Sequence, residues 1–282
     1  MTSRAADVAS AVQLACLLEA SAPKPGNVTP THRFDDVGYE HFLASAAAIG
    51  PAFSLVSAQP LGRTILDAAR ATARWAPANT NLGIILLLAP LARAAVARTP
   101  SLREQVGRVL TDTTVGDAAD AYEAIRLARP GGVGRAAAQD VGGTPTVSLL
   151  DAMRLAAGRD AIAREYATAF ATTFDVGAPT LAHARRDGLS WDDAIVECFL
   201  ALLATTPDTL IARKLGPAAA SSISRQAAQI RDKGGVRSTA GRAALARFDA
   251  ALRGDRNVRN PGATADLTAA AIFVTLACGD RR

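Results

Sequence analysis

The sequence predicts an all-helical fold for this chain of 282 residues, and three observations favour it. Apolar residues make up 49% of the chain, aromatic residues only 5%, and alanine, leucine and arginine, all good helix formers, dominate. Apolar side chains recur at three- and four-residue spacing, and few β-branched runs alternate with polar residues. No linker or internal repeat divides the chain. We therefore expect one compact domain over residues 1–282, with roughly 11–14 helices and no significant sheet.

The helical pattern can be followed along the whole chain. In the first expected helix, Val8, Val12 and Leu18 share one face. The expected helices cover residues 5–20, 39–58, 61–75, 82 onward, 102–110, 114–128, 147–157, 160–174, 179–186, 191–203, 205–216, 217–233, 237–253 and 260–278. Pro51 should break or kink the second of these, because proline lacks the backbone donor that a helix needs.

Composition also narrows the function. The formal net charge of +5 is spread along the chain without a basic run or aromatic stacking partners, which argues against nucleic-acid binding and favours a modest attraction for a small anion. The most apolar stretch, residues 82–92, is too short to span a bilayer and predicts a buried helix. The N-terminus has no secretory signal pattern and the cysteines form no CxxC pair, so we expect a cytoplasmic protein that does not bind membranes. A homo-oligomer is compatible with the sequence.

The stretch from Glu19 to Asp36 carries the densest set of chemically useful side chains. Lys24-Pro25-Gly26-Asn27 has the composition of a tight turn, with proline at the second position and glycine at the third. Glu19 precedes this turn, and Asp35 and Asp36 follow it. The stretch alone leaves two interpretations open, a solvated loop between helices and a site for a phosphorylated ligand.

Further polar clusters stand at expected helix starts or in loops. They comprise Asn79, Thr80 and Asn81; Asp112; Asp140 in the glycine-rich segment 129–146; Asp208, Arg213 and Lys214; and Asn260, Gly262 and Asp266. Helix capping could account for several of them individually. Together, carboxylate and amide oxygens suit Mg²⁺, and lysine, arginine and free N–H groups suit phosphates. The three histidines show no zinc spacing.

Five of these motifs resemble, in order along the chain, the triphosphoribosyl-dephospho-CoA synthase family. The matching residues are Lys24-Pro25-Gly26-Asn27-Val28; Phe42 to Ser45 with Pro51 and Phe53; Thr80-Asn81 with Gly83; Asp208-Thr209 with Arg213; and Asn260-Pro261-Gly262 with Ala265-Asp266-Leu267. The resemblance implies an all-helical enzyme that uses ATP and 3'-dephospho-CoA. Such an enzyme joins C1 of the ATP ribose to the 2'-hydroxyl of the acceptor, releases adenine and keeps the triphosphate.

Two departures from the family pattern are visible. The His-Lys pair that follows Thr-Asn-Thr in the family is absent here, where Leu82-Gly83 stands, and Ala263 replaces a second glycine. These changes resemble a divergent branch found in archaea and methylotrophic bacteria, for which a pterin-ribitol acceptor of methanopterin-type C1 cofactors is the alternative substrate. A helical nucleotide-binding or scaffold protein without catalysis is the alternative from another functional class.

The resemblance and the polar clusters together give a hypothesis for the site. Asp35 or Asp266 is expected to accept the proton of the attacking hydroxyl. Mg²⁺ is expected to be held by carboxylates, namely Glu19, Asp36, Asp112 and Asp208. The nucleotide is expected to contact Lys24, Pro25, Gly26, Asn27, Asn79, Thr80, Asn81, Arg213, Lys214, Asn260 and Gly262. Lys24, together with Arg213 or Lys214, is expected to contact the triphosphate.

Overall fold

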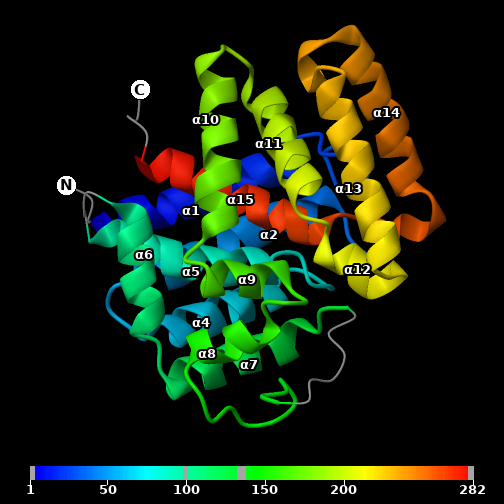
Figure 1. Cartoon of the computed structure of the whole chain (residues 1–282). Helices are drawn as coiled ribbons and strands as arrows, with labels where there is room; N and C mark the ends of the chain where they lie inside the picture. The colour runs from blue at the N-terminus through cyan, green and yellow to red at the C-terminus, as the bar shows by residue number, and fades with distance from the viewer. Residues whose placement is uncertain (1–3, 98–100, 132–137, 279–282) are drawn as a thin grey trace.

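The computed structural model describes residues 4–97, 101–131 and 138–278, and most of these residues lie in helices joined by loops (Figure 1). No strand occurs among them, and the one extended pairing is an isolated antiparallel bridge between Thr29 and His32. The predicted all-helical class is therefore confirmed. Part of the predicted glycine-rich segment, residues 132–137, lies outside the described residues.

The helices follow the predicted periodicity closely. Their bounds are α1 Arg4–Ser21, α2 Tyr39–Ala48, α3 Gly50–Ser54, α4 Leu61–Ala73, α5 Leu82–Val96, α6 Leu102–Thr111, α7 Val115–Ala128, α8 Leu149–Ala156, α9 Ala161–Ala167, α10 Ala178–Arg186, α11 Trp191–Thr205, α12 Thr209–Leu215, α13 Pro217–Asp232, α14 Thr239–Arg253 and α15 Gly262–Cys278. A π-helical turn, η1, covers Thr173–Gly177, and two short 3₁₀ turns are η2 Gly235–Arg237 and η3 Asp255–Asn257.

Two predicted helices are each divided in the structure. The break in 39–58 falls at Ile49. Pro51 stands in the first turn of α3, where proline is tolerated because the N–H groups of that turn have no partner within the helix. The predicted helix 160–174 ends early, because Ala169 and Phe170 adopt positive φ angles of 49° and 61°. The ring of Phe170 is fully buried at that point, so tertiary packing overrides the local helical pattern.

The centre of the molecule is built from α5 and α15. Both are apolar around their whole circumference, so both must be surrounded by other helices. In Figure 1, α15 crosses the middle of the molecule beside α1. Helices α1, α4, α6, α7 and α9 pack around α5, while α1, α10 and α11 pack around α15. This arrangement brings the N-terminal ends of two buried helices together inside the protein.

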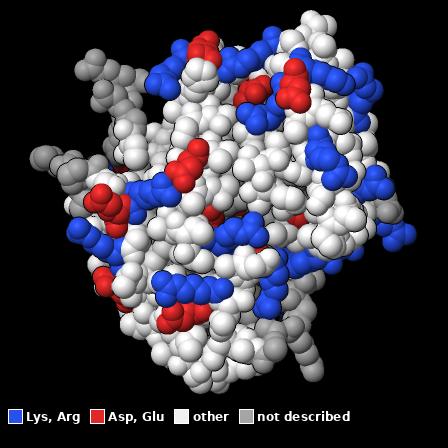
Figure 2. Space-filling view, viewed as in Figure 1, with Lys and Arg blue, Asp and Glu red and all other residues white. Residues whose placement is uncertain are grey.

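A second, smaller core lies between α11, α12, α13 and α14. Helix α11 serves both cores, with Ile195 and Leu202 in the larger one and Phe199 and Leu203 in the smaller one. Figure 1 shows α13 and α14 side by side at one edge of the molecule, and Figure 2 shows several lysine and arginine side chains on that edge.

Among the described residues, no single helix is long and apolar enough to cross a membrane. Helices α11 and α12 reach the required length only when taken together, and they are bent by 55° relative to each other.

A buried tyrosine supplies the hydrogen bond that α5 lacks at its internal proline. Pro90 lies inside α5 and has no N–H to donate to the carbonyl of Leu86, four residues earlier. The hydroxyl of Tyr166, which is 1% exposed, donates to that carbonyl oxygen at 2.6 Å. The hydrogen bond therefore ties α9 to α5 at the point where α5 lacks its own.

We expect Tyr166→Phe to lower the free energy of unfolding by about 1–3 kcal/mol, because it leaves a buried carbonyl without a donor. Urea unfolding followed by circular dichroism measures this. The control is the same substitution in a Pro90→Ala background, where the restored N–H of residue 90 can serve Leu86. An equal cost in both backgrounds would contradict the explanation.

Candidate active site

The described residues enclose a cavity of about 870 Å³ at the meeting point of several helix starts. The N-terminal ends of α5, α9 and α15 reach it, and α7, α8 and α12 supply further wall. Predicted site residues that line it are Glu19, Asn27, Asp35, Asp36, Asn79, Thr80, Asn81, Arg213, Lys214, Asn260, Gly262 and Asp266. Lys24, Pro25, Gly26, Asp112 and Asp208 do not line it.

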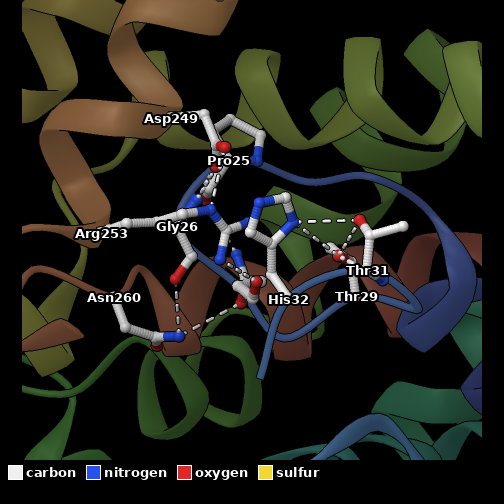
Figure 3. A network of polar contacts seen from close by, with 9 residues as sticks. Pro25, Gly26, Thr29, Thr31, His32, Asp249, Arg253 and Asn260 are labelled. Atoms are coloured by element: carbon white, nitrogen blue, oxygen red, sulfur yellow. Dashed lines mark hydrogen bonds and ion pairs between the residues drawn. The ribbon is translucent and has the colours of Figure 1, made fainter. Parts of the chain in front are cut away.

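The Lys24–Asn27 turn joins distant parts of the chain (Figure 3). Gly26 has a φ of 72°, and its N–H donates to the carboxylate of Asp249 in α14 at 2.7 Å. Asn260, at the start of α15, donates its amide to the Gly26 carbonyl at 3.1 Å. Arg253 bonds both Asp249 and the Asn27 carbonyl. The turn therefore holds α14 and α15 together, and Pro25 and Gly26, predicted as nucleotide contacts, belong to this turn and do not line the cavity.

The burial of Lys24 gives no support to its predicted phosphate contact. Its side chain is enclosed, with 0% of the residue exposed. The ammonium pairs with the Glu19 carboxylate at 3.0 Å and also donates to the Glu19 carbonyl. A phosphate in the cavity has no access to it. Glu19, only 3% exposed, does line the cavity, with its charge compensated from behind by Lys24.

Three consecutive polar residues precede α5 at the cavity wall. Asn79 accepts a hydrogen bond from the N–H of Leu82 at 3.0 Å, so it caps the helix. The hydroxyl of Thr80 lies 2.7 Å from that of Ser45. Asn81 is 4% exposed, and its amide nitrogen has no hydrogen-bond partner among the described residues.

Asp266 lies one turn into α15, directly against Gly83 in the first turn of α5. A Cβ atom at Gly83 would lie 2.1 Å from a carboxylate oxygen of Asp266, so only glycine leaves room for that carboxylate. None of the described residues donates a hydrogen bond to it. Burial raises the pKa of Asp266 well above its ordinary value, and the neighbouring carboxylate of Glu19 raises it further.

Asp208 was predicted as a metal ligand, and the structure uses it differently. It is 1% exposed and caps α12 by accepting from the N–H groups of Leu210 and Ile211 at 2.8 and 3.1 Å. Its other oxygen accepts from the N–H and the hydroxyl of Thr264 in α15, at 2.7 and 2.8 Å. Four donors occupy the carboxylate, which therefore fixes the start of α12 to α15 and has no free oxygen for a cation.

The remaining predicted magnesium ligands do not come together either. Asp112 is exposed at the C-terminal end of α6, outside the cavity lining. Asp36 is exposed at the cavity, next to Asp35. Among the described residues, no three His, Cys, Asp or Glu side chains are arranged to hold a metal ion. The side chains therefore do not fit a resident magnesium centre built by the protein.

Basic residues reach the cavity from elements other than the Lys24 turn. Arg213 lines it from α12 and pairs with Asp160, the N-cap of α9, at 2.5 Å. The other basic residues in the lining are Arg129, Arg159, Lys214 and Arg256. Sequence reasoning identified Arg213 and Lys214 and missed the other three. It also missed the pair with Asp160, because the two residues are 53 positions apart.

A family model described as "CitG: ATP:dephospho-CoA triphosphoribosyl transferase" matches residues 5–281. The chain is also similar to a crystal structure from Archaeoglobus fulgidus that is named after triphosphoribosyl-dephospho-CoA synthase. That match has a TM-score of 0.68 and 29% sequence identity, and it covers 85% of this chain and 100% of the other.

Two curated proteins match over shorter segments. The 2-(5''-triphosphoribosyl)-3'-dephosphocoenzyme-A synthase of Klebsiella pneumoniae is 35% identical over 101 residues, which are 36% of this chain and 35% of that protein. A protein of Pseudomonas savastanoi pv. phaseolicola, named as probably the same synthase, is 34% identical over 113 residues, 40% of this chain and 38% of the other. Each aligned segment thus spans little more than a third of the relative. Because the family model covers nearly the whole chain, this protein belongs to the ATP:dephospho-CoA triphosphoribosyl transferase family.

Proposed function

We propose that this protein transfers the triphosphoribosyl group of ATP to the 2'-hydroxyl of 3'-dephospho-CoA and releases adenine. Family membership supports this reaction, as do the names of the two curated relatives. The observation that carries the proposal within the structure is the half-buried Asp266 carboxylate at the cavity wall, with a raised pKa and no hydrogen-bond donor of its own. A carboxylate with a raised pKa at a cavity wall is typical of a site for proton transfer and is not needed in a scaffold protein.

The cavity offers separate surroundings for the two ends of ATP. Arg213 and Lys214 on α12, with Arg159 and Arg256 nearby in the lining, supply cations for the triphosphate. Glu19 and Asp266 lie on the wall made by α1, α5 and α15. We place the ribose C1 at this acidic wall, because positive charge develops on C1 when adenine departs and carboxylates stabilise it.

The reaction then needs one base. The N9–C1 bond breaks and its electron pair stays with adenine, while the oxygen of the acceptor hydroxyl forms the new bond to C1. The hydroxyl proton passes to the Asp266 carboxylate. Adenine takes up one proton from water and Asp266 later returns its proton to water, so that protons balance. A raised pKa makes the ionised form of Asp266 a stronger base than an aspartate with the ordinary pKa. No observation favours a pterin-type acceptor.

Incubation with ATP and dephospho-CoA is expected to release adenine and to give a product heavier than the acceptor by a triphosphoribosyl group. Chromatography of the base and mass spectrometry of the product measure both. A reaction without the acceptor serves as the control for simple hydrolysis. If neither adenine release nor ATP binding is detected, the transferase proposal fails.

Asp266→Asn is expected to lower kcat by about 10²–10⁴-fold, the range that general base catalysis contributes. The amide keeps the shape of the side chain, so binding of ATP should be largely retained and can be checked by calorimetry. Asp35→Asn is the matched control at an exposed position of the same cavity, and it should keep most of the activity. Normal turnover by Asp266→Asn would refute the assignment of the base.

The same Asp266→Asn variant should gain stability relative to the wild type as pH rises. The folded-state pKa of Asp266 lies above the unfolded value, so its stabilising contribution is complete below the ordinary value of 3.8 and is lost as pH rises through the folded pKa. The asparagine variant avoids that loss. Thermal unfolding at about pH 4 and about pH 8 measures it, and a difference in Tm that does not grow between them would argue against a buried, titrating Asp266.

A further inference from the structure

The charge of the chain is concentrated in one part of the fold, although the sequence contains no basic run. Residues 213–259 hold eleven of the 31 lysines and arginines and only three of the 26 aspartates and glutamates. This segment therefore carries a formal charge of +8, and since the whole chain has +5, the remainder carries −3. It comprises the end of α12, then α13 and α14, and Figure 2 shows basic side chains on the edge that α13 and α14 form.

Most of these cations have no acidic partner. Four form ion pairs, namely Arg213 with Asp160, Arg237 with Asp187, Arg242 with Asp193, and Arg253 with Asp249. The other seven are exposed and make no ion pair with a described side chain, and we call them the basic face: Lys214, Arg225, Arg231, Lys233, Arg247, Arg256 and Arg259. Exposed charges of one sign add up to a potential that extends into the solvent.

The basic face reaches the cavity. Lys214 of α12 and Arg256 of η3 line it. Helix α13 begins three residues after Lys214, and α14 ends three residues before Arg256, so one end of each helix lies near the cavity. From these ends, at the rise of an α-helix, Arg225 lies about 12 Å along α13, Arg247 about 9 Å along α14 and Arg231 about 21 Å along α13.

The composition of the segment indicates which anion the basic face attracts. Phe248 is the only aromatic residue of 213–259, and it is buried, so a nucleic acid finds no stacking partner there. Among the described side chains of the segment, Leu215 is the one large apolar group that is exposed, so apolar anchors for a protein or a membrane are lacking. These observations favour a small, soluble polyanion. ATP is the polyanion that the proposed transfer brings to this cavity.

We propose that the basic face draws ATP to the cavity by long-range attraction, with Arg225 and Arg247 acting on the nucleotide without lining its site. This inference rests on the proposed transfer, in which ATP enters the cavity. Salt screens such attraction over about 8 Å at about 0.15 M ionic strength and over about 30 Å at about 0.01 M. At the higher ionic strength only the residues nearest the cavity contribute, whereas at the lower one the far end of α13 contributes as well.

The test neutralises two pairs of exposed residues at different distances and measures ATP binding by calorimetry. Arg225→Gln/Arg247→Gln removes two charges near the cavity. Arg231→Gln/Lys233→Gln is the matched control, because it removes the same charge at the far end of α13. At about 0.15 M ionic strength we expect the near pair to weaken ATP binding about two- to fivefold and the far pair less than about 1.5-fold. At about 0.01 M both pairs should weaken it, the near pair more strongly.

Three further measurements separate charge from other effects. Adenosine has no phosphate, so its affinity is expected to be the same in every variant. Arg225→Lys/Arg247→Lys keeps both charges and should bind ATP like the wild type. None of the four substituted positions lines the cavity, so kcat for adenine release should not change. Circular dichroism checks that the variants fold.

Equal losses from the near and the far pair at about 0.15 M would overturn the proposal. Wild-type affinity for ATP in Arg225→Gln/Arg247→Gln would do the same, as would an equal loss of adenosine affinity. If the wild type binds ATP but releases no adenine, the proposed transfer fails, and the comparison of ATP affinities still decides the role of the basic face. Absence of ATP binding to the wild type would overturn both.

Discussion

The close contact between Gly83 and Asp266 is the constraint on which the site depends. It brings the N-terminal ends of α5 and α15 so near that a single methyl group at residue 83 would collide with the carboxylate. Both helices are mostly apolar, so their bodies are fixed by the core and only their N-terminal ends reach the cavity. The carboxylate is therefore placed by the packing of two entire helices. Such placement is more rigid than a loop would allow.

Other polar residues maintain this arrangement without facing the cavity. Asp208 binds the start of α12 to Thr264 of α15 through four hydrogen bonds. Asn260 binds the Gly26 turn, which in turn is bound to α14 by Asp249. Behind the wall, Lys24 compensates the charge of Glu19, so that Asp266 faces a carboxylate already paired with a cation. The charged residues named here thus divide into supports with full partners and Asp266, which has no hydrogen-bond donor among the described residues.

Much of the fold could be predicted from the sequence, because helical periodicity is a local property. The exceptions have tertiary causes, such as the buried ring of Phe170, which ends a helix that the local pattern would continue. The site was predicted less well. The sequence predicts Lys24 as a phosphate contact and Glu19 as a metal ligand, and it does not show that the two side chains pair with each other. That ion pair is visible only in the folded chain. Gly83 carried no signal of its role, since the atom it makes room for is 183 positions away.

The distribution of partners also explains how the cavity can lack the His-Lys pair of the family pattern. Residues 82 and 83 are here leucine and glycine, and the glycine is the one that admits Asp266. Positive charge enters instead from α12 and from loops around the mouth, where Arg213 is oriented by Asp160. Because that charge lies on a different wall from the carboxylates, a triphosphate and a developing cation at C1 can be stabilised at the same time. Arg213 of α12 lowers the pKa of Asp266, but burial and the carboxylate of Glu19 have larger effects and keep that pKa raised.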